Sequence, residues 1–301
     1  MKIFNPGLVH TPVTPFKRDH RIDFDSFGRL IEFHLKNGAD AIAVPMPAGE
    51  DVSLTDEEQR RLLEFAIERI NGRVPVIAHA SDAGTSLSVA RARHAEAAGA
   101  AAVVSHPPYF WHPKPEMILE HLEQIGSAIR IPFYICTPPV ETAGTSLTTE
   151  ITLQLIKRLD NYVGVVDSSL TWVYMIETIS NARNLNPHFQ VIPDSDFMVP
   201  AAAIGGSGAF SPLSGVAPKL VRRLYSLCAN QRYTEARKPQ EEIAALYHLV
   251  KNGRLKGAMR AMGRDCGQPR PPALPLEADE YEKLERELKT MPFLREEPSG
   301  W

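Results

Sequence analysis

The sequence predicts an α/β protein, a (β/α)8 TIM barrel with a C-terminal helical extension. Eight short apolar segments alternate with segments of helical spacing before residue 216, a pattern typical of parallel strands joined by helices. Beyond that point several helices are expected and no strand. The chain has 301 residues, a length that an α/β barrel commonly reaches as one domain. We therefore expect the barrel over residues 1–215 and a helical extension packed on it over residues 216–301.

Each predicted strand is a short apolar segment with a helix expected after it. In chain order the expected strands cover residues 9–11, 41–44, 74–78, 102–104, 132–135, 162–166, 189–192 and 208–211. A strand–helix alternation of this kind closes a parallel barrel when it is repeated eight times.

The predicted helices follow from apolar spacing and from end signals. Thr55 with Glu58 forms a capping box at one helix start, and Gly99 ends the helix expected over 85–98. The other barrel helices are expected over 25–37, after Pro115, from about 148, from about 170 and over 197–204. Helices of the extension are expected over 218–229, 235–250 and 279–290.

Composition excludes several classes of protein. The formal net charge of −3 implies no strongly basic face, so we expect no nucleic-acid partner. The longest apolar runs are strand-sized, well short of the ~20 residues of a membrane helix, and no signal-peptide core opens the chain. Cys136, Cys228 and Cys266 lack metal-ligand spacing and indicate reduced thiols. We expect a cytoplasmic protein with no membrane partner.

Six motifs occur in a characteristic order along almost the whole chain. They are Thr11–Phe16, Gly49–Glu50 with Ser53–Glu58, Pro107–Phe110, Tyr134, Gly205–Ser211 with Ala217–Pro218, and Arg270–Pro272. Together they resemble the dihydrodipicolinate synthase / N-acetylneuraminate lyase family. The resemblance implies class I aldolase-type chemistry on a 2-oxo acid and a homo-oligomer, usually a tetramer built as a dimer of dimers.

The residues that depart from the family pattern are those of its active site. Asn161–Ser169 resembles the family's sixth strand, but Val166 stands where the family has the lysine that forms a Schiff base. Valine has no amine to attack a ketone. Pro47 and Ala48 replace a threonine pair, and Phe110 replaces a second tyrosine. The resemblance thus leaves Tyr134 as the survivor of the proton relay, and no arginine follows it to contact a substrate carboxylate.

Polar residues at the expected carboxyl ends of the strands form a candidate site, since active sites of this fold lie there. They are His10, Glu50, His79, His106, Tyr134, Asp167, Asp194 and Ser211. His79 or His106 would be a general base, Tyr134 the proton donor, and Asp167 or Asp194 the orienting carboxylate. We expect the substrate to contact Ala48, Gly49, Glu50, Tyr109, Val166, Asp194 and Ser211.

Several alternatives stay open at this point. The polar residues at the strand ends could instead hydrogen-bond one another, with Asp167 capping the following helix. Alternatively, His and Asp side chains among them could bind a divalent metal. We expect no cofactor and no metal. The favoured function is a lyase-type enzyme acting on a small 2-oxo acid or related carbonyl or hydroxy acid without a Schiff base. The alternatives are a non-catalytic barrel that binds a ligand or partner, an aldolase with a relocated lysine, and a Cys136 nucleophile.

Overall fold

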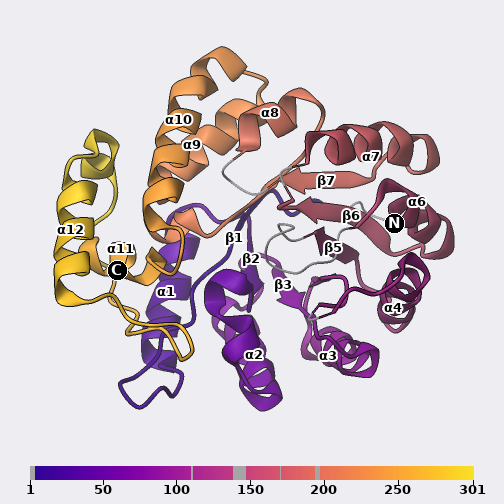
Figure 1. Ribbon diagram of the computed structural model, residues 1–301, viewed down its shortest axis with the longest axis horizontal. Coiled ribbons are helices and arrows are strands. Elements are labelled where there is room, and N and C mark those ends of the chain that lie inside the picture. The colour runs from indigo at the N-terminus through magenta and orange to yellow at the C-terminus, as the bar shows by residue number, and fades with distance from the viewer. Residues whose placement is uncertain (1–3, 110, 138–146, 170, 194–196) are drawn as a thin grey trace.

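The computed structural model describes residues 4–109, 111–137, 147–169, 171–193 and 197–301. Its centre is a sheet of eight parallel strands in the order β7-β6-β5-β4-β3-β2-β1-β8. β7 and β8 lie next to each other, so the sheet is a nearly closed barrel (Figure 1). The strands are β1 Leu8–His10, β2 Ala41–Val44, β3 Val76–His79, β4 Ala102–Ser105, β5 Phe133–Thr137, β6 Tyr162–Asp167, β7 Gln190–Pro193 and β8 Ala209–Ser211.

Among the described residues one α-helix follows each strand and covers the outside of the barrel. These helices are α1 Phe24–Lys36, α2 Asp56–Ile70, α3 Thr85–Ala98, α4 Pro115–Ser127, α6 Thr149–Arg158, α7 Trp172–Leu185, α8 Met198–Ala203 and α9 Pro218–Ala229. The capping box of Thr55 and Glu58 opens α2, and Gly99 ends α3 with φ +96°. The predicted (β/α)8 barrel is thereby confirmed, with each strand within a few residues of its predicted position.

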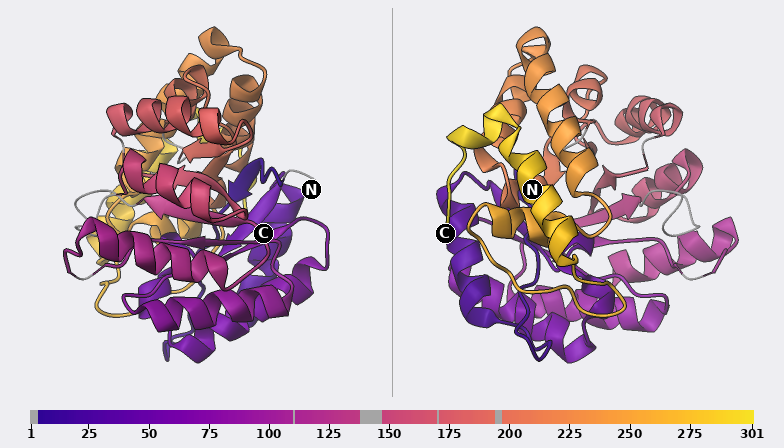
Figure 2. Two further views of the ribbon diagram at one scale, coloured as in Figure 1. Left: turned by 90° about the vertical axis from the view of Figure 1, so that its right-hand side faces the viewer. Right: turned by 60° about the vertical axis from the view of Figure 1, so that its left-hand side comes forward.

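Helices continue after the barrel, as the sequence predicts. They are α10 Tyr233–Val250, α11 Leu255–Ala261, which was not predicted, and α12 Ala278–Lys289. The C-terminal helices lie against the N-terminal part of the chain (Figure 2). At that contact the guanidinium of Arg29 on α1 lies 5.1 Å from the ring centre of Trp301. In the described part of the chain no helix has the length and apolar character needed to cross a bilayer.

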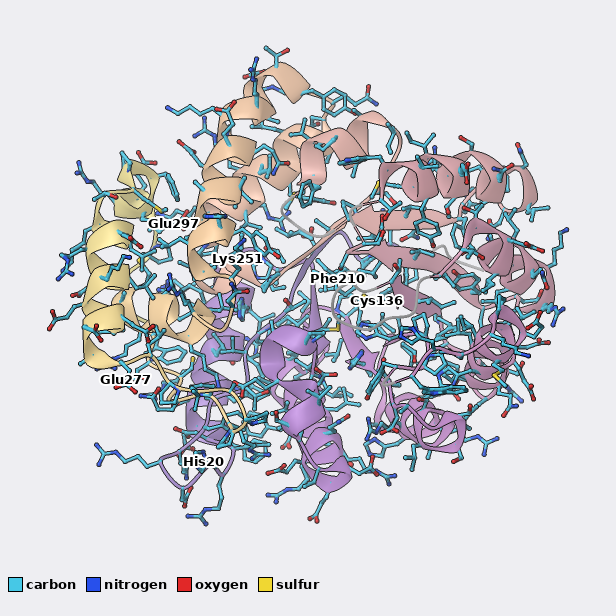
Figure 3. All side chains as sticks on the ribbon, in the orientation of Figure 1. His20, Cys136, Phe210, Lys251, Glu277 and Glu297 are labelled. Carbon is cyan, nitrogen blue, oxygen red and sulfur yellow. The ribbon has the colours of Figure 1, made fainter. Side chains whose placement is uncertain are left out.

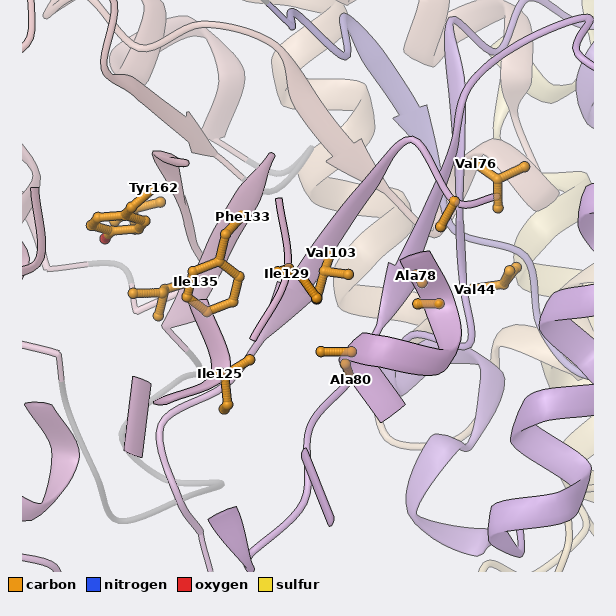
Figure 4. Close-up of a cluster of buried hydrophobic side chains, with 14 of the residues drawn as sticks. Val44, Val76, Ala78, Ala80, Val103, Ile125, Ile129, Phe133, Ile135 and Tyr162 are labelled. Atoms are coloured by element: carbon orange, nitrogen blue, oxygen red, sulfur yellow. The ribbon is translucent and has the colours of Figure 1, made fainter. Parts of the chain in front are cut away.

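Alternation along the strands divides the core into two layers. On β5, Phe133 and Ile135 face the surrounding helices, and Tyr134 and Cys136 face the barrel interior. Figure 4 shows part of the outer layer, where strand side chains meet Ile125 and Ile129 of the α4 region. Because side chains alternate with period two, each strand ends in one residue that points inward and one that points outward. This alternation decides which polar residues reach the barrel mouth.

The extension is joined to the barrel by two cations. Lys256 of α11 is buried, and its Nζ lies 2.5 Å from Oε1 of Glu50 in the segment after β2. The backbone N–H of Arg270 donates to the other carboxylate oxygen of Glu50 at 2.7 Å, and its guanidinium binds both oxygens of Glu58. Glu50 has φ +58°, so these bonds hold a left-handed residue in place.

Candidate active site

The barrel axis is apolar at the position where the sequence suggested lost imine chemistry. Val166 faces inward and is 1% exposed, and the β-ladders pair it with Cys136 on β5 and Ile192 on β7. Phe210 belongs to the same inward-facing cluster, and Figure 3 shows Cys136 and Phe210 near the barrel centre. A proton relay to residue 166 would have to start from these inward neighbours, which carry alkyl groups, an aromatic ring and one thiol.

Tyr134 lies one inward layer below this position. Its hydroxyl donates to Oε1 of Gln190 at 3.1 Å and lies 3.5 Å from the carbonyl oxygen of Phe4. Gln190 is the first residue of β7 and Phe4 precedes β1, so the hydroxyl points toward the amino ends of the strands. This position does not fit the proton-donor role expected for Tyr134, because active sites of this fold lie at the carboxyl ends of the strands.

Replacing Tyr134 with phenylalanine is expected to leave turnover unchanged and to lower the free energy of unfolding by about 1 kcal/mol, the contribution of one buried hydrogen bond. Urea unfolding and steady-state kinetics measure the two effects. Tyr109→Phe, at the opposite end of the barrel, is the matched comparison. A loss of turnover in the Tyr134 variant at unchanged stability would place this hydroxyl in the reaction after all.

A polar cluster forms at the carboxyl ends of β3 and β4. Nε2 of His79 lies 2.7 Å from the Ser81 hydroxyl, and Nδ1 of the same ring lies 3.4 Å from Oδ2 of Asp51. The backbone N–H of His106 donates to the Ser81 hydroxyl oxygen at 2.7 Å. The rings of His79 and His106 meet edge to face with centres 4.9 Å apart. We call Asp51, His79, Ser81 and His106 the polar cluster.

Burial sets the protonation of the polar cluster. Burial, helped by the positive charge of Arg91, lowers the pKa of His79 to about 3. Burial and the neighbouring His79 lower the pKa of His106 to about 3, while Asp51 acts in the opposite direction. Burial raises the pKa of Asp51. Both imidazoles are therefore neutral near pH 7, the form that accepts a proton.

Hydrogen-bond directions follow from that neutral state. Because the Ser81 oxygen already accepts from the His106 N–H, its own hydrogen is free to be donated to Nε2 of His79. Nδ1 of His79 then carries the ring proton and faces Asp51. Nε2 of His106 is buried and has no hydrogen-bond partner among the described residues. The cluster thus contains a hydrogen bond between Ser81 and His79 with Asp51 nearby, and one imidazole nitrogen of His106 without a partner among the described residues.

Arg91 of α3 fixes the loop that carries Ser81. Its guanidinium donates to the Ser81 carbonyl at 2.5 Å and pairs with Asp56 and Asp82, each at 2.8 Å. Asp51, Ser81 and Arg91 were not predicted as site residues. Ser81 stands two residues after His79 in the sequence, a spacing that could have indicated it. Arg91 comes from the helix of the same βα unit, ten residues after Ser81, and Asp51 comes from the preceding unit, after β2.

The remaining predicted residues are dispersed. Ala48 and Gly49 form a short 3-10 turn after β2, and Glu50 binds Lys256 and Arg270 as described. Asp167 accepts from the backbone N–H and hydroxyl of Ser169, a local turn like the cap that the sequence left open. His10 faces His34 of α1, and Ser211 is fully buried beside His10 in the β1–β8 ladder. Asp194 and Phe110 lie outside the described residues.

Tyr109 lies near the polar cluster. Burial raises its pKa to about 12, with Asp82 and Asp51 acting in the same direction. Its hydroxyl therefore stays protonated in the neutral range. Within the described ranges no group of three or more His, Cys, Asp or Glu side chains is arranged to hold a metal ion.

The fold is a (β/α)8 barrel with a candidate site at the carboxyl ends of its strands, and comparisons with known proteins give its family. The model of the Dihydrodipicolinate synthetase family matches residues 5–291. The chain belongs to this family, so the predicted resemblance and the expected lyase-type enzyme are confirmed at that level.

Curated relatives and solved structures match along most of their length. The 4-hydroxy-tetrahydrodipicolinate synthase of Thermoanaerobacter sp. (strain X514) is 30% identical over 289 residues, covering 94% of this chain and 96% of the relative. The enzyme of the same name from Acetivibrio thermocellus is 30% identical over 282 residues, covering 92% and 94%. The crystal structure of dihydrodipicolinate synthase from Aquifex aeolicus has a TM-score of 0.89 at 27% identity, covering 94% of this chain and 97% of that one.

Proposed function

We propose that this chain is a lyase that works without a Schiff base on a small 2-oxo acid or a related carbonyl or hydroxy compound. Two observations on the barrel interior and on the carboxyl ends of its strands, taken together, support this most directly. Val166 presents an alkyl group where an imine-forming amine would be needed. The polar cluster, at the carboxyl ends of β3 and β4, offers neutral imidazoles for general acid–base catalysis.

Nε2 of His106 is the proposed base. It accepts a proton from the carbon next to a substrate carbonyl, and the imidazolium that forms is stabilised by the charge of Asp51. The same proton is then returned to a hydroxyl group on the next carbon, which leaves as water. Atoms and charge balance without a cofactor. His79, oriented by Ser81 and Asp51, keeps one face of the His106 ring fixed.

The proposal includes a homo-oligomer in the cytoplasm, as a dimer of dimers. Large apolar side chains are half-exposed on one side of the barrel, at Leu87 (50%), Trp111 (47%) and Met117 (45%). A second copy of the chain would remove this area from water. All three cysteine side chains are buried, in keeping with a reducing compartment. Sedimentation velocity tests the assembly.

Borohydride reduction in the presence of pyruvate and longer 2-oxo acids is the first test, read by intact mass and peptide mapping. We expect no lysine adduct. Lys256 is the residue to examine most closely, because burial lowers its pKa, although Glu50 at 2.5 Å holds its ammonium. An adduct on any lysine would restore imine chemistry and refute the proposal.

The second test replaces the imidazoles. His106→Gln is expected to lower turnover of a substrate found by screening carbonyl and hydroxy compounds by about 100-fold or more, the usual contribution of a general base. His188→Gln, at an exposed site remote from the mouth, is the matched control. Unchanged turnover in the His106 variant contradicts the assigned base. A folded protein that turns over nothing in the screen would instead favour the non-catalytic, ligand-binding barrel.

A further inference from the structure

We infer that this site selects an uncharged carbonyl or hydroxy-carbonyl compound and discriminates against a free carboxylate. The inference rests on the proposed function and narrows its substrate class. A carboxylate taken out of water needs a cation or several N–H donors in place of its hydration shell. The described residues at the carboxyl ends of the strands provide neither an available cation nor several available N–H donors.

The turn after β2 has few backbone donors left for an anion. Pro47 has no N–H. The N–H of Gly49 donates to the carbonyl of Met46 at 2.6 Å, and that of Glu50 donates to the carbonyl of Pro47 at 3.0 Å. Of the four described residues from Pro47 to Glu50, at most Ala48 has an N–H to offer. One amide cannot replace the several hydrogen bonds that a carboxylate makes in water.

The cations close to the mouth are already neutralised. All three nitrogens of the Arg91 guanidinium are used, by Asp56, Asp82 and the Ser81 carbonyl. The ammonium of Lys256 pairs with Glu50, and the guanidinium of Arg270 pairs with Glu58. Since each cation has at least one carboxylate partner, a substrate anion would have to displace an existing ion pair.

The sequence extends this argument to every segment that leads from a strand to the next helix. Those after β2, β3, β5, β6, β7 and β8 contain no lysine or arginine. The segments after β1 and β4 contain four, Lys17, Arg18, Arg21 and Lys114, and each of these is exposed. Asp51, by contrast, is buried inside the polar cluster at 6% exposure. The buried group beside the proposed base is therefore an acid, which supplies no positive charge.

The histidines of the polar cluster add no positive charge near neutral pH. Burial lowers the pKa of both His79 and His106 to about 3, so neither ring supplies a positive charge. An incoming carboxylate would lie beside the Asp51 carboxyl group and two neutral rings, none of which offers it a positive charge. An amide, ester or hydroxyketone of the same size needs no cation and can still accept a hydrogen bond through its carbonyl oxygen.

Matched pairs of small molecules test the inference on the full-length protein. Pyruvate is compared with pyruvamide, and glycerate with glycerol and dihydroxyacetone, by ligand-observed NMR at neutral pH. We expect the neutral member to bind about tenfold or more tightly than the carboxylate, because desolvation of an unpaired anion is not compensated. Asp51→Asn is expected to narrow the difference in affinity between the neutral ligand and the carboxylate of each pair. Asp160→Asn, at an exposed site before β6, is the control and should change the affinity for neither ligand.

The outcomes separate this inference from the proposed function. Pyruvate binding as tightly as pyruvamide, or neither member of any pair binding, overturns the uncharged-substrate inference. Turnover of a carboxylate that depends on His106 would overturn it too and leave the proposed lyase standing. Selective binding of neutral members without turnover supports the selectivity and counts against the lyase.

Discussion

Replacing Arg264 with methionine is expected to lower the free energy of unfolding by about 3 kcal/mol or more, since it removes the donor from several buried acceptors at once. Arg264 is 0% exposed. Its guanidinium donates to the backbone carbonyl oxygens of Gly215, Val216, Met262, Pro298 and Gly300. These carbonyls belong to the segment before α9, the end of α11 and the C-terminal tail. One side chain thus joins the end of the barrel to two parts of the extension.

Methionine fills much of the same volume and offers no donor, so the carbonyls would lose their partners inside the protein. Burial lowers the pKa of Arg264 to about 10, which leaves the guanidinium charged at pH 7. Equilibrium urea unfolding at pH 7 measures the effect. Arg237→Met, with a side chain that is 83% exposed, is the matched control and is expected to change stability by less than about 0.5 kcal/mol. Equal stability of the two variants would contradict the structural role given to Arg264.

The fold could be predicted from the sequence because apolar periodicity is a local signal. Each strand pairs with its chain neighbours, and its apolar segment is visible without knowledge of the rest. The same locality explains why His79 and His106 were identified, since both follow directly from the ends of predicted strands. Asp51 was missed because it enters the cluster from a different βα unit, through the turn after β2.

Tyr134 shows where sequence reasoning on a strand fails. Tyr134 and Cys136 are two positions apart on the strand and both point inward, so alternation cannot tell them apart. Along a strand this offset is about 6.6 Å, enough to move a side chain from the barrel mouth to a lower layer. The ladder register decides the question by pairing Cys136 with Val166. Register depends on how neighbouring strands align, which a single sequence does not give.

Acid is expected to destabilise the protein through buried neutral histidines, and the His10–His34 pair is the sharpest case. Their Nδ1 atoms lie 3.0 Å apart, and Nε2 of each ring has no hydrogen-bond partner among the described residues. Burial, with Arg264 acting in the same direction, lowers the pKa of His34 to about 3. Burial, His34 and Arg222 lower the pKa of His10 well below its usual value.

The sign of the pH effect follows from these shifts. Between pH 6.5 and about 3 the unfolded chain binds protons that the folded pair does not, so the folded state loses stability as pH falls. From pH 7.5 to 5.5 this amounts to about 1.4 kcal/mol for each histidine. The double variant His10→Gln/His34→Gln should therefore lose about 3 kcal/mol less than the parent over that range. Gln does not titrate, so a lower stability of the variant at pH 7.5 leaves this difference intact. Urea unfolding at both pH values supplies the measurement, with His188→Gln as the exposed control. An unchanged pH dependence in the double variant would mean that the pair is protonated in the folded protein or opens to water before unfolding.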